Sequence, residues 1–360
     1  MNGKTAFVLA GALLAAACGG KDIHDPLCSV VATTSFSVTP VDPISDVASK
    51  FDALFQSAGK EFGVSANLLK SVGYIETRWQ MIKGSEEFEG RPAAYGVMAL
   101  RGDRLARGAA LAGVSVEAAK TDASANIRAA AALLAADGLE KFSGIEQPEA
   151  RAAYTRQVYE ADGVPGAAVA ASPNASNCPS PPAPTVDYTS AVWHASPNFN
   201  ARATSTISMV IIHTCESNYA SCWGWLVDPA SQVSAHYVVN ENGSEISQLV
   251  REKDRAWQIA AYYDCTLNQS YNCAMNGVQM NHFTIGIEHG GFAAQDSFPT
   301  SQLQASAKLV CDLTKRQGIP RDSLHIVGHG QMQPNNRTDP GPHWPWHRYI
   351  GMVRSYCGES

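Results

Sequence analysis

The stretch Met209-Val210-Ile211-Ile212-His213-Thr214 decides the fold of the second half of this 360-residue chain. Four consecutive apolar residues are typical of a strand that is buried on both faces, as in a sheet covered by helices. The surrounding pattern predicts a hairpin over 237–250 with an Asn-Gly turn, strands at 283–288 and 325–328, and a helix around 303–314. We therefore predict an α/β domain with a mixed central sheet over residues 187–360.

The upstream half has a helical pattern instead. Apolar residues recur at helical spacing in Phe51, Leu54, Phe55, Ala58 and Phe62. Gly63 is expected to end this helix and Ser65 to cap the next one. With the alanine-rich stretches 125–136 and 148–159, this pattern predicts an all-α domain over residues 47–165. A Ser/Thr/Pro/Asp-rich tether at 19–46 precedes it, and an Ala/Ser/Pro linker at 166–186 follows it. The chain is therefore expected to be multidomain.

Composition and charge narrow the class of protein. Hydrophobic residues make up 45% and charged residues 17% of the chain, which is typical of a globular protein. The formal net charge is −6, whereas nucleic-acid-binding domains usually carry a basic surface. We therefore expect a folded protein that does not bind nucleic acid.

The first eighteen residues resemble a bacterial lipoprotein signal. Lys4 precedes the apolar run Ala6–Ala17, which is too short to cross a membrane and ends in small residues followed by Cys18. The resemblance implies that residues 1–18 are a signal with a lipobox and that Cys18 carries the lipid. Gly19 and Gly20 then favour an outer-membrane lipoprotein that faces the periplasm. The alternative is an ordinary signal peptide that happens to contain a cysteine.

Eight cysteines remain once Cys18 is set aside, and an even number in an oxidising compartment predicts four disulfides. Two pairs are close enough in sequence to close small loops. Sequence leaves the connectivity open, and the pairing that we favour is Cys215/Cys222, Cys265/Cys273, Cys311/Cys357 and Cys28/Cys178. A cysteine zinc site is disfavoured because the chain has no Cys-x-x-Cys pair.

Histidine and carboxylate residues stand at the ends of predicted strands in the second half. His213 and His329 each follow a strand, Asp339 comes ten residues after His329, and Glu288 ends a third strand. Strand ends of an α/β sheet meet at one edge, and two histidines with one carboxylate leave open the fourth position that a catalytic zinc needs. Each residue alone has an ordinary structural explanation, such as a hydrogen-bonded histidine or an Asp turn. Spacing alone leaves metal binding open.

The motifs around these residues resemble the zinc-dependent N-acetylmuramoyl-L-alanine amidases, a family that includes peptidoglycan-recognition proteins and phage amidase lysozymes. The shared strings are Ile211-Ile-His213-Thr, Val233-Ser-Ala-His236-Tyr, Arg255-Ala-Trp257, Ile285-Gly-Ile-Glu288, Gly328-His329 and Arg337-Thr-Asp339-Pro-Gly-Pro, followed by Trp344-Pro-Trp346. The resemblance implies that His213, His329 and Asp339 bind zinc and that Glu288 is the catalytic carboxylate.

Three further positions acquire roles from the same resemblance. Arg337 stands where the family often has lysine, and a permanently charged guanidinium can stabilise an oxyanion but not transfer a proton. Trp257 and Gln258 are expected to contact substrate, and Gln258 stands where many relatives carry histidine. His236, His282, His289 and His343 are given no ligand role, with His236 packed in the sheet, and His325 is expected to be structural.

The helical half carries one candidate acid. Glu76 lies on the apolar stripe of its helix with Leu69 and Val72. The segments 71–79 and 94–100, together with Tyr154, resemble motifs of lytic transglycosylases, a lysozyme-like family. The resemblance implies Glu76 as acid and base, with Tyr95 and Tyr154 contacting the glycan.

Departures from the transglycosylase pattern leave alternatives for the helical half. Thr77 and Ala99 replace the serine and glutamine of that family. The domain is therefore either a glycan-cleaving domain or a glycan-binding one with a vestigial Glu76. Position alone favours a solvated Glu76, or one paired with Arg78.

Together these patterns predict an envelope-anchored, monomeric peptidoglycan hydrolase with a zinc amidase as its main activity. The alternative from another class is a peptidoglycan-recognition protein that binds muropeptides without cutting them. An open metal site together with a base at Glu288 favours the enzyme, since a binder needs neither. A toxin that diffuses to competitors is disfavoured by the lipid anchor.

Overall fold

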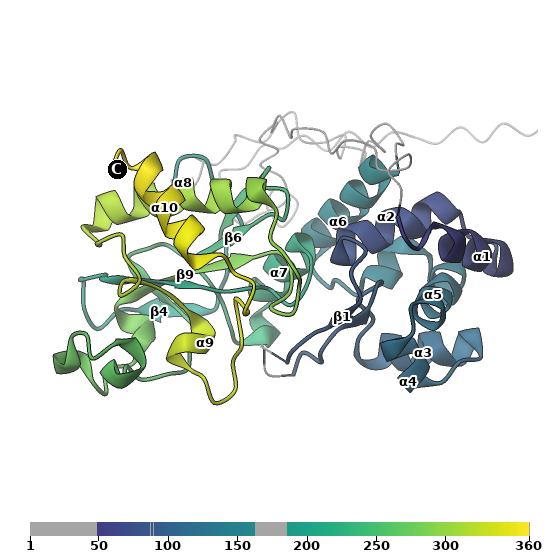
Figure 1. Ribbon diagram of the computed structural model, residues 1–360, viewed down its shortest axis with the longest axis horizontal. Coiled ribbons are helices and arrows are strands. Elements are labelled where there is room, and N and C mark those ends of the chain that lie inside the picture. Colours follow the sequence, from purple (N-terminus) through teal and green to yellow (C-terminus); the bar gives the residue numbers. More distant parts are fainter. Residues whose placement is uncertain (1–48, 87, 89, 163–185, 360) are drawn as a thin grey trace, which may run out of the picture. The chain divides into compact units, whose positions relative to one another are not determined.

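The computed structural model describes residues 49–86, 88, 90–162 and 186–359. The predicted signal, tether and most of the linker lie outside these residues, as do Cys18, Cys28 and Cys178. The described residues all belong to one compact unit. The predicted order of a helical part followed by an α/β part is present in it (Figure 1).

The helical part consists of six helices and one short β-hairpin among the described residues. These elements are α1 (Asp52–Phe62), α2 (Ala66–Thr77), β1 (Ile82–Lys83), β2 (Tyr95–Gly96), α3 (Gly102–Ala112), α4 (Val116–Thr121), α5 (Ala123–Ser143) and α6 (Pro148–Ala161). Gly63 ends α1 in the left-handed conformation, and the Ser65 side chain caps α2 by accepting from the Leu68 amide. Both predicted boundaries are confirmed.

A six-stranded mixed sheet organises the α/β part. Its strands lie in the order β10 (Ile326–Gly328), β5 (Met209–Ile212), β9 (Thr284–His289), β6 (Tyr237–Val239), β7 (Ile246–Gln248) and β3 (Val192–Trp193). The four strands β10, β5, β9 and β6 run parallel, and β6 and β7 form the predicted antiparallel hairpin. The mixed sheet is thus confirmed.

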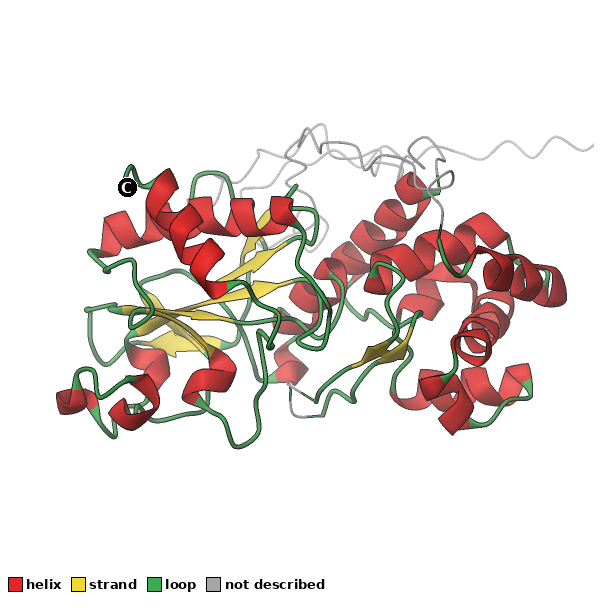
Figure 2. Cartoon of the chain, viewed as in Figure 1, coloured by secondary structure: helices red, strands yellow, loops and turns green. Residues whose placement is uncertain are grey.

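Helices and loops bury both faces of this sheet. Val210 and Ile212 of β5 contribute to a core with α8 (Thr300–Gln317) and α10 (Trp346–Tyr356), which cover one face in Figure 2. Met209 and Ile211 belong to a second core with Met280. All four residues of β5 are buried, as the apolar run predicts. The remaining elements are β4 (Phe199–Ala201), α7 (Tyr219–Leu226), η2 (Pro229–Ser231), β8 (Asp254–Ala256), η3 (Cys265–Asn268), η4 (Cys273–Met275), η5 (Met280–His282) and α9 (His329–Met332).

The helical and α/β parts share a core. Buried residues of α2, α5 and α6 form one apolar cluster with Cys222, Trp223 and Leu226 of α7. Gly224 makes this close approach between α6 and α7 feasible, because a Cβ there would lie 2.7 Å from the Ala150 side chain. The two parts of the chain are therefore in direct contact through α6 and α7.

Three of the four predicted disulfides are present. They join Cys215 to Cys222, Cys265 to Cys273, and Cys311 to Cys357. The last pair ties α8 to the residue that follows α10. The predicted Cys28/Cys178 pair lies outside the described residues.

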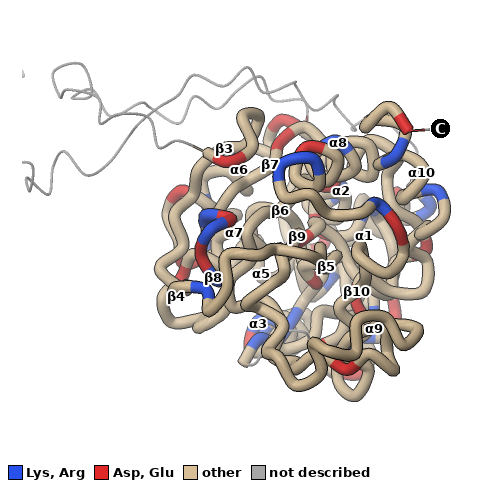
Figure 3. Tube along the Cα trace, turned by 90° about the vertical axis from the view of Figure 1, so that its left-hand side faces the viewer, with Lys and Arg blue, Asp and Glu red and all other residues tan. Residues whose placement is uncertain are grey.

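Acidic and basic residues are mixed along the chain in the view of Figure 3. Among the described residues, no helix is both long enough and apolar enough to span a bilayer.

Candidate metal centre

Two neighbouring strands bring the predicted histidine ligands together. β5 and β10 are parallel, with Ile212 opposite Gly328, so that His213 and His329 leave the sheet at the same edge. Gly328 lets the Asp339 loop approach, because a Cβ there would lie 2.9 Å from the Pro340 ring. The Gly330 amide then donates to the Asp339 carbonyl at 2.7 Å. The strand ends and two glycines therefore place all three predicted ligands side by side.

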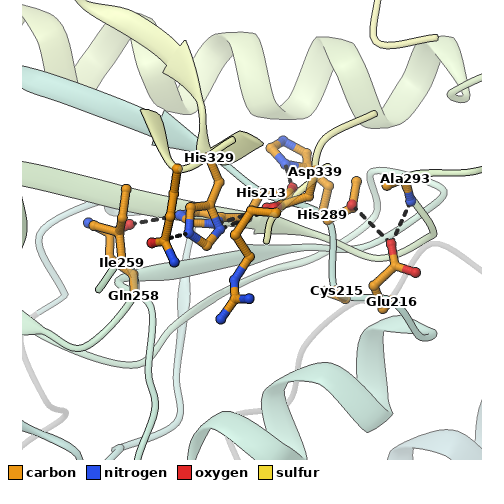
Figure 4. A network of polar contacts seen from close by, with 12 residues as sticks. His213, Cys215, Glu216, Gln258, Ile259, His289, Ala293, His329 and Asp339 are labelled. Atoms are coloured by element: carbon orange, nitrogen blue, oxygen red, sulfur yellow. Dashed lines mark hydrogen bonds and ion pairs between the residues drawn. The ribbon is translucent and has the colours of Figure 1, made fainter. Parts of the chain in front are cut away.

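The Nδ1 atoms of the two histidines and the Asp339 carboxylate lie close together (Figure 4). His213 Nδ1 lies 3.1 Å from His329 Nδ1 and 3.0 Å from Asp339 Oδ2, and His329 Nδ1 lies 3.1 Å from Asp339 Oδ1. Ligands of a tetrahedral zinc with bonds of ~2.0–2.1 Å are separated by roughly 3.3 Å. The donor set and its spacing therefore fit a metal ion of this kind.

Burial and charge favour a cation at this point. Asp339 is 2% exposed, and His213 and His329 are also buried. Although burial alone would raise the pKa of Asp339, the two adjacent imidazoles hold it well below its usual range. A buried ionised carboxylate beside two nitrogen donors is suited to bind a divalent metal.

His289 supports the His213 backbone without acting as a ligand. Its Nδ1 lies 2.9 Å from the His213 carbonyl oxygen, and its Nε2 lies 2.7 Å from Ser306 Oγ. Burial lowers the pKa of His289 to about 3, so the ring is neutral near pH 7. Trp344 packs against it with ring centroids 4.6 Å apart. Sequence analysis gave His289 no ligand role, and its contacts with His213 and Ser306 were not predicted.

Gln258 contacts one of the predicted ligands directly. Its Oε1 lies 3.0 Å from His213 Nε2, whereas His213 Nδ1 faces His329 and Asp339. Its side chain also lines the cavity beside the metal centre. Sequence analysis expected a substrate contact here, and the contact with His213 was not predicted.

A cavity of about 340 Å³ opens beside the three ligands. Glu288, Arg337 and Trp257, the other residues predicted for this site, all line it. Glu288 is 2% exposed and lies on β9, on the same face as Thr284 and Gly286. Trp257 is held by a hydrogen bond from Nε1 to Asn200 Oδ1 of 3.2 Å. Phe88, from the helical part, also lines this cavity and was not predicted.

Glu76 lies outside this cavity, in the helical part. It is 7% exposed, and both of its carboxylate oxygens accept hydrogen bonds, from Tyr154 Oη at 2.8 Å and from Asn218 Nδ2 at 3.0 Å. It lines a separate cavity of about 490 Å³ with Arg91 and Arg101. Position alone favours a Glu76 that is solvated or paired with Arg78. The structure shows neither, because Glu76 is buried and bonded to Tyr154 and Asn218.

The two predicted glycan-contacting tyrosines have different surroundings. Tyr154 is fully buried, and burial together with the Glu76 carboxylate raises its pKa, so its hydroxyl stays a donor. Tyr95 pairs in the β1–β2 hairpin and carries the Lys120 ammonium 5.1 Å from its ring centre. It is not among the described residues that line the cavities beside Glu76.

Asn218 was missed by sequence analysis. Its Oδ1 accepts from the Ser221 amide and caps α7, a role that the sequence pattern could have indicated. Its contact with Glu76 spans 142 residues, and no local signal predicts it.

The remaining histidines behave largely as expected. His236 is fully buried and its ring contacts Arg202 and the Gly286 amide. His325 bonds to Asp322 and Tyr271, which confirms a structural role. His282 contacts Arg255, and His343 is exposed.

Comparison with known proteins identifies the family. The sequence profile described as N-acetylmuramoyl-L-alanine amidase matches residues 203–342. N-acetylmuramoyl-L-alanine amidase A of Achromobacter lyticus is 32% identical over 192 residues, which cover 48% of this chain and 98% of that protein. The chain belongs to the N-acetylmuramoyl-L-alanine amidase family. It is therefore an enzyme that hydrolyses the amide bond between N-acetylmuramic acid and L-alanine of the peptidoglycan stem peptide.

Two further similarities concern the same part of the chain. The amidase AmiD of Escherichia coli is 27% identical over 148 residues, 39% of this chain and 51% of AmiD, so the match spans about half of that relative. A crystal structure of a selenomethionine derivative of AmpD is 26% identical, with a TM-score of 0.38 over 47% of this chain and 99% of that chain.

Proposed function

We propose that His213, His329 and Asp339 hold a zinc ion and that the amide bond is cleaved in the cavity beside them. The observation that supports this most is the convergence of two imidazole nitrogens and one carboxylate within about 3 Å of one another. The nearby Cys215 and Cys222 are not available as softer ligands, because they form a disulfide. Three protein ligands would leave a four-coordinate zinc with one position for water or substrate, and the three residues line the cavity.

Glu288 and Arg337 supply the protein's part of the chemistry. When bound, zinc polarises the amide carbonyl and makes a water molecule more acidic. The Glu288 carboxylate accepts the proton of the attacking water and passes it to the leaving amine nitrogen. The Arg337 guanidinium donates hydrogen bonds to the carbonyl oxygen as negative charge develops, a role worth roughly 3–4 kcal/mol in other enzymes. Arg337 moves no proton, since guanidinium stays charged.

The substrate is a muropeptide within or released from peptidoglycan. Trp257 lies in the wall of the cavity with its ring edge held by Asn200, and it presents a flat apolar surface suited to a sugar or peptide face.

The location we propose is the periplasmic face of the outer membrane. Cys18 follows a short apolar run of signal type, and a lipid on this residue would keep the monomeric enzyme beside the peptidoglycan layer. Three disulfides in the described residues support an oxidising compartment.

Digestion of purified peptidoglycan sacculi tests the proposed function. The chain without its first eighteen residues should release free stem peptides, and a chelator should abolish the release, with recovery on adding zinc. Intact lactyl amide bonds at full zinc occupancy would contradict it. Binding without cleavage under those conditions would instead support the non-catalytic recognition alternative.

A second, glycan-directed function is favoured by one observation in the helical part. The Tyr154 hydroxyl donates to Glu76 beside a cavity large enough for sugar rings. We propose that this lysozyme-like part engages the glycan strand. With both Glu76 oxygens accepting hydrogen bonds, glycan binding is favoured over cleavage. Anhydro-muramyl ends that disappear in Glu76→Gln would establish cleavage, and their absence from wild-type digests would leave a binding role.

A further inference from the structure

The two ring nitrogens of His213 have different surroundings, and this difference decides which one can bind a metal. Nδ1 points at His329 and Asp339, whereas Nε2 points at Gln258 Oε1, 3.0 Å away. A neutral imidazole carries a proton on one nitrogen and a lone pair on the other. Only the form with the proton on Nε2 leaves a lone pair on Nδ1 for a metal.

The orientation of the Gln258 carboxamide follows from the chain of hydrogen bonds behind it. The Met280 carbonyl can only accept, so the Thr284 hydroxyl donates to it, at 2.9 Å. The Thr284 oxygen then accepts from Gln258 Nε2, also at 2.9 Å. This leaves Gln258 Oε1 facing His213 as an acceptor. The carboxamide oxygen therefore selects the proton on Nε2 of His213.

The residues packed around Gln258 hold its side chain in this orientation. A Cβ on Gly286 would lie 1.5 Å from Gln258 Oε1, so the strand β9 has a glycine where the carboxamide crosses it. Asn281 Oδ1 accepts from the backbone amides of Gln258 and Ile259, at 3.3 and 3.0 Å. Thr284 is fully buried. The position of Gln258 Oε1 is thus fixed by the hydrogen bond to Thr284, by the space that Gly286 leaves and by the hydrogen bonds of Asn281 to the backbone.

His329 has a similar but weaker partner. Its Nε2 lies 3.3 Å from Gln333 Oε1, and Gln333 Nε2 donates to Asn336 Oδ1 at 2.9 Å. Asn336 is exposed and Gln333 is half-buried, so water competes for this second chain. Each metal-facing histidine therefore has a glutamine oxygen behind it, and the one behind His213 is more firmly held.

We infer that Gln258 is a positioning residue of the metal centre, which holds the His213 ring with Nε2 protonated and Nδ1 directed at the metal. This inference rests on the metal site of the proposed function and concerns how that site is kept ready. A carboxamide is a neutral acceptor, so it orients the ring without adding charge to a centre that already contains Asp339. Partners of this kind typically change metal affinity by ~10–100-fold.

Zinc affinity measured by competition with a chromogenic chelator tests the role of Gln258 without any turnover. Gln258→Met keeps the side-chain length and removes the acceptor, and we expect zinc affinity to fall by ~10–100-fold. Gln258→Glu places a carboxylate oxygen at the same point and should retain wild-type affinity or exceed it. Gln333→Met should cause a smaller loss than Gln258→Met. The matched control is Gln279→Met, whose side chain contacts Ile259 and neither metal-facing histidine, and its affinity should be unchanged.

A second readout follows the proton itself. In zinc-loaded protein labelled with ¹⁵N-histidine, the His213 Nε2–H should give a ring resonance that exchanges slowly with solvent. Gln258→Met should lose this resonance and Gln258→Glu should keep it, while the buried His289 and His236 rings provide internal references. A residue that only fills space would lower thermal stability and leave this resonance and the zinc affinity unaltered.

The outcomes separate this inference from the proposed function. If wild-type protein takes up no zinc, both fail. If wild-type protein binds zinc and Gln258→Met binds it equally tightly with an unchanged ring resonance, only the positioning role is wrong. Should Gln258→Met not fold, Thr284→Val keeps Gln258 but removes the acceptor for its amide, and we expect a measurable loss of zinc affinity because the Gln258 carboxamide is then less firmly oriented. Wild-type affinity in Thr284→Val would then overturn the inference.

Discussion

At the residue scale, burial decides the protonation of several histidines in the α/β part. His289 and His194 both have lowered pKa values, of about 3 and about 4, because burial penalises the charged ring. His194 stacks on Trp223, with ring centroids 4.0 Å apart and planes 9° apart. Neither ring is among the predicted metal ligands, and the lowered pKa of each makes the stability of the fold depend on pH.

The lowered pKa of His194 predicts how the free energy of unfolding depends on pH. Its folded pKa of about 4 lies below the unfolded value of 6.5, so the unfolded chain binds more protons between these values. The stabilising effect is complete above pH 6.5 and is lost as pH falls towards 4. His194→Phe retains a stacked ring and cannot titrate. Between pH 7 and 4.5 we expect the wild type to lose about 2 kcal/mol more unfolding free energy than the variant. Denaturant titrations at several pH values measure this, and parallel curves for the two proteins would contradict it.

At the element scale, the elements that sequence alone predicted are those whose own residues dictate burial. The apolar run of β5 and the helical spacing of α1 and α8 required no knowledge of distant partners. β4 and β8 were not predicted, because β4 is exposed at all three residues and pairs with a strand more than fifty residues away. The same distinction holds in the site. The strand ends predicted the convergence of His213 and His329, whereas the Gln258 and Asn218 contacts depend on tertiary packing.

Gly286 in strand β9 leads to a prediction, because a side chain at this position would collide with Gln258. In Gly286→Ala the new Cβ would meet Gln258 Oε1 at 1.5 Å and force the carboxamide away from His213. We expect a loss of about 1–3 kcal/mol in unfolding free energy, as for other overpacked sites, together with weakened zinc binding. Chemical denaturation and chelator competition measure the two effects. Gly351→Ala in α10 is the control, because a Cβ there meets no atom within 4 Å. Equal behaviour of the two variants would show that β9 does not need this glycine.

At the scale of the whole molecule, the disulfides differ in how much chain they constrain. Cys311 and Cys357 are 46 residues apart and join α8 to the end of α10, whereas Cys265 and Cys273 are 8 apart. α8 and α10 together cover one face of the sheet that carries the candidate metal centre. The longer bridge therefore secures the layer behind the site.

Loop length predicts unequal costs for removing these bridges. Replacing Cys311 and Cys357 by alanine should lower the unfolding free energy by about 4 kcal/mol, against about 2.5 kcal/mol for Cys265 and Cys273. Guanidinium denaturation of the two double variants beside the wild type gives both values. A larger loss from the 265–273 pair would show that local contacts, and not chain entropy, set the contribution of each bridge.

The central claim is that Glu288 acts on an amide bond beside a metal held by His213, His329 and Asp339. The most direct measurement is the rate of lactyl–L-alanine cleavage in a purified muropeptide by wild type and Glu288→Gln, each with its zinc content determined. We predict one zinc per chain in both proteins and a rate that falls by ~10²–10⁴-fold in the variant, as expected for loss of a general base. A zinc-loaded Glu288→Gln protein that cleaves at the wild-type rate would contradict the account.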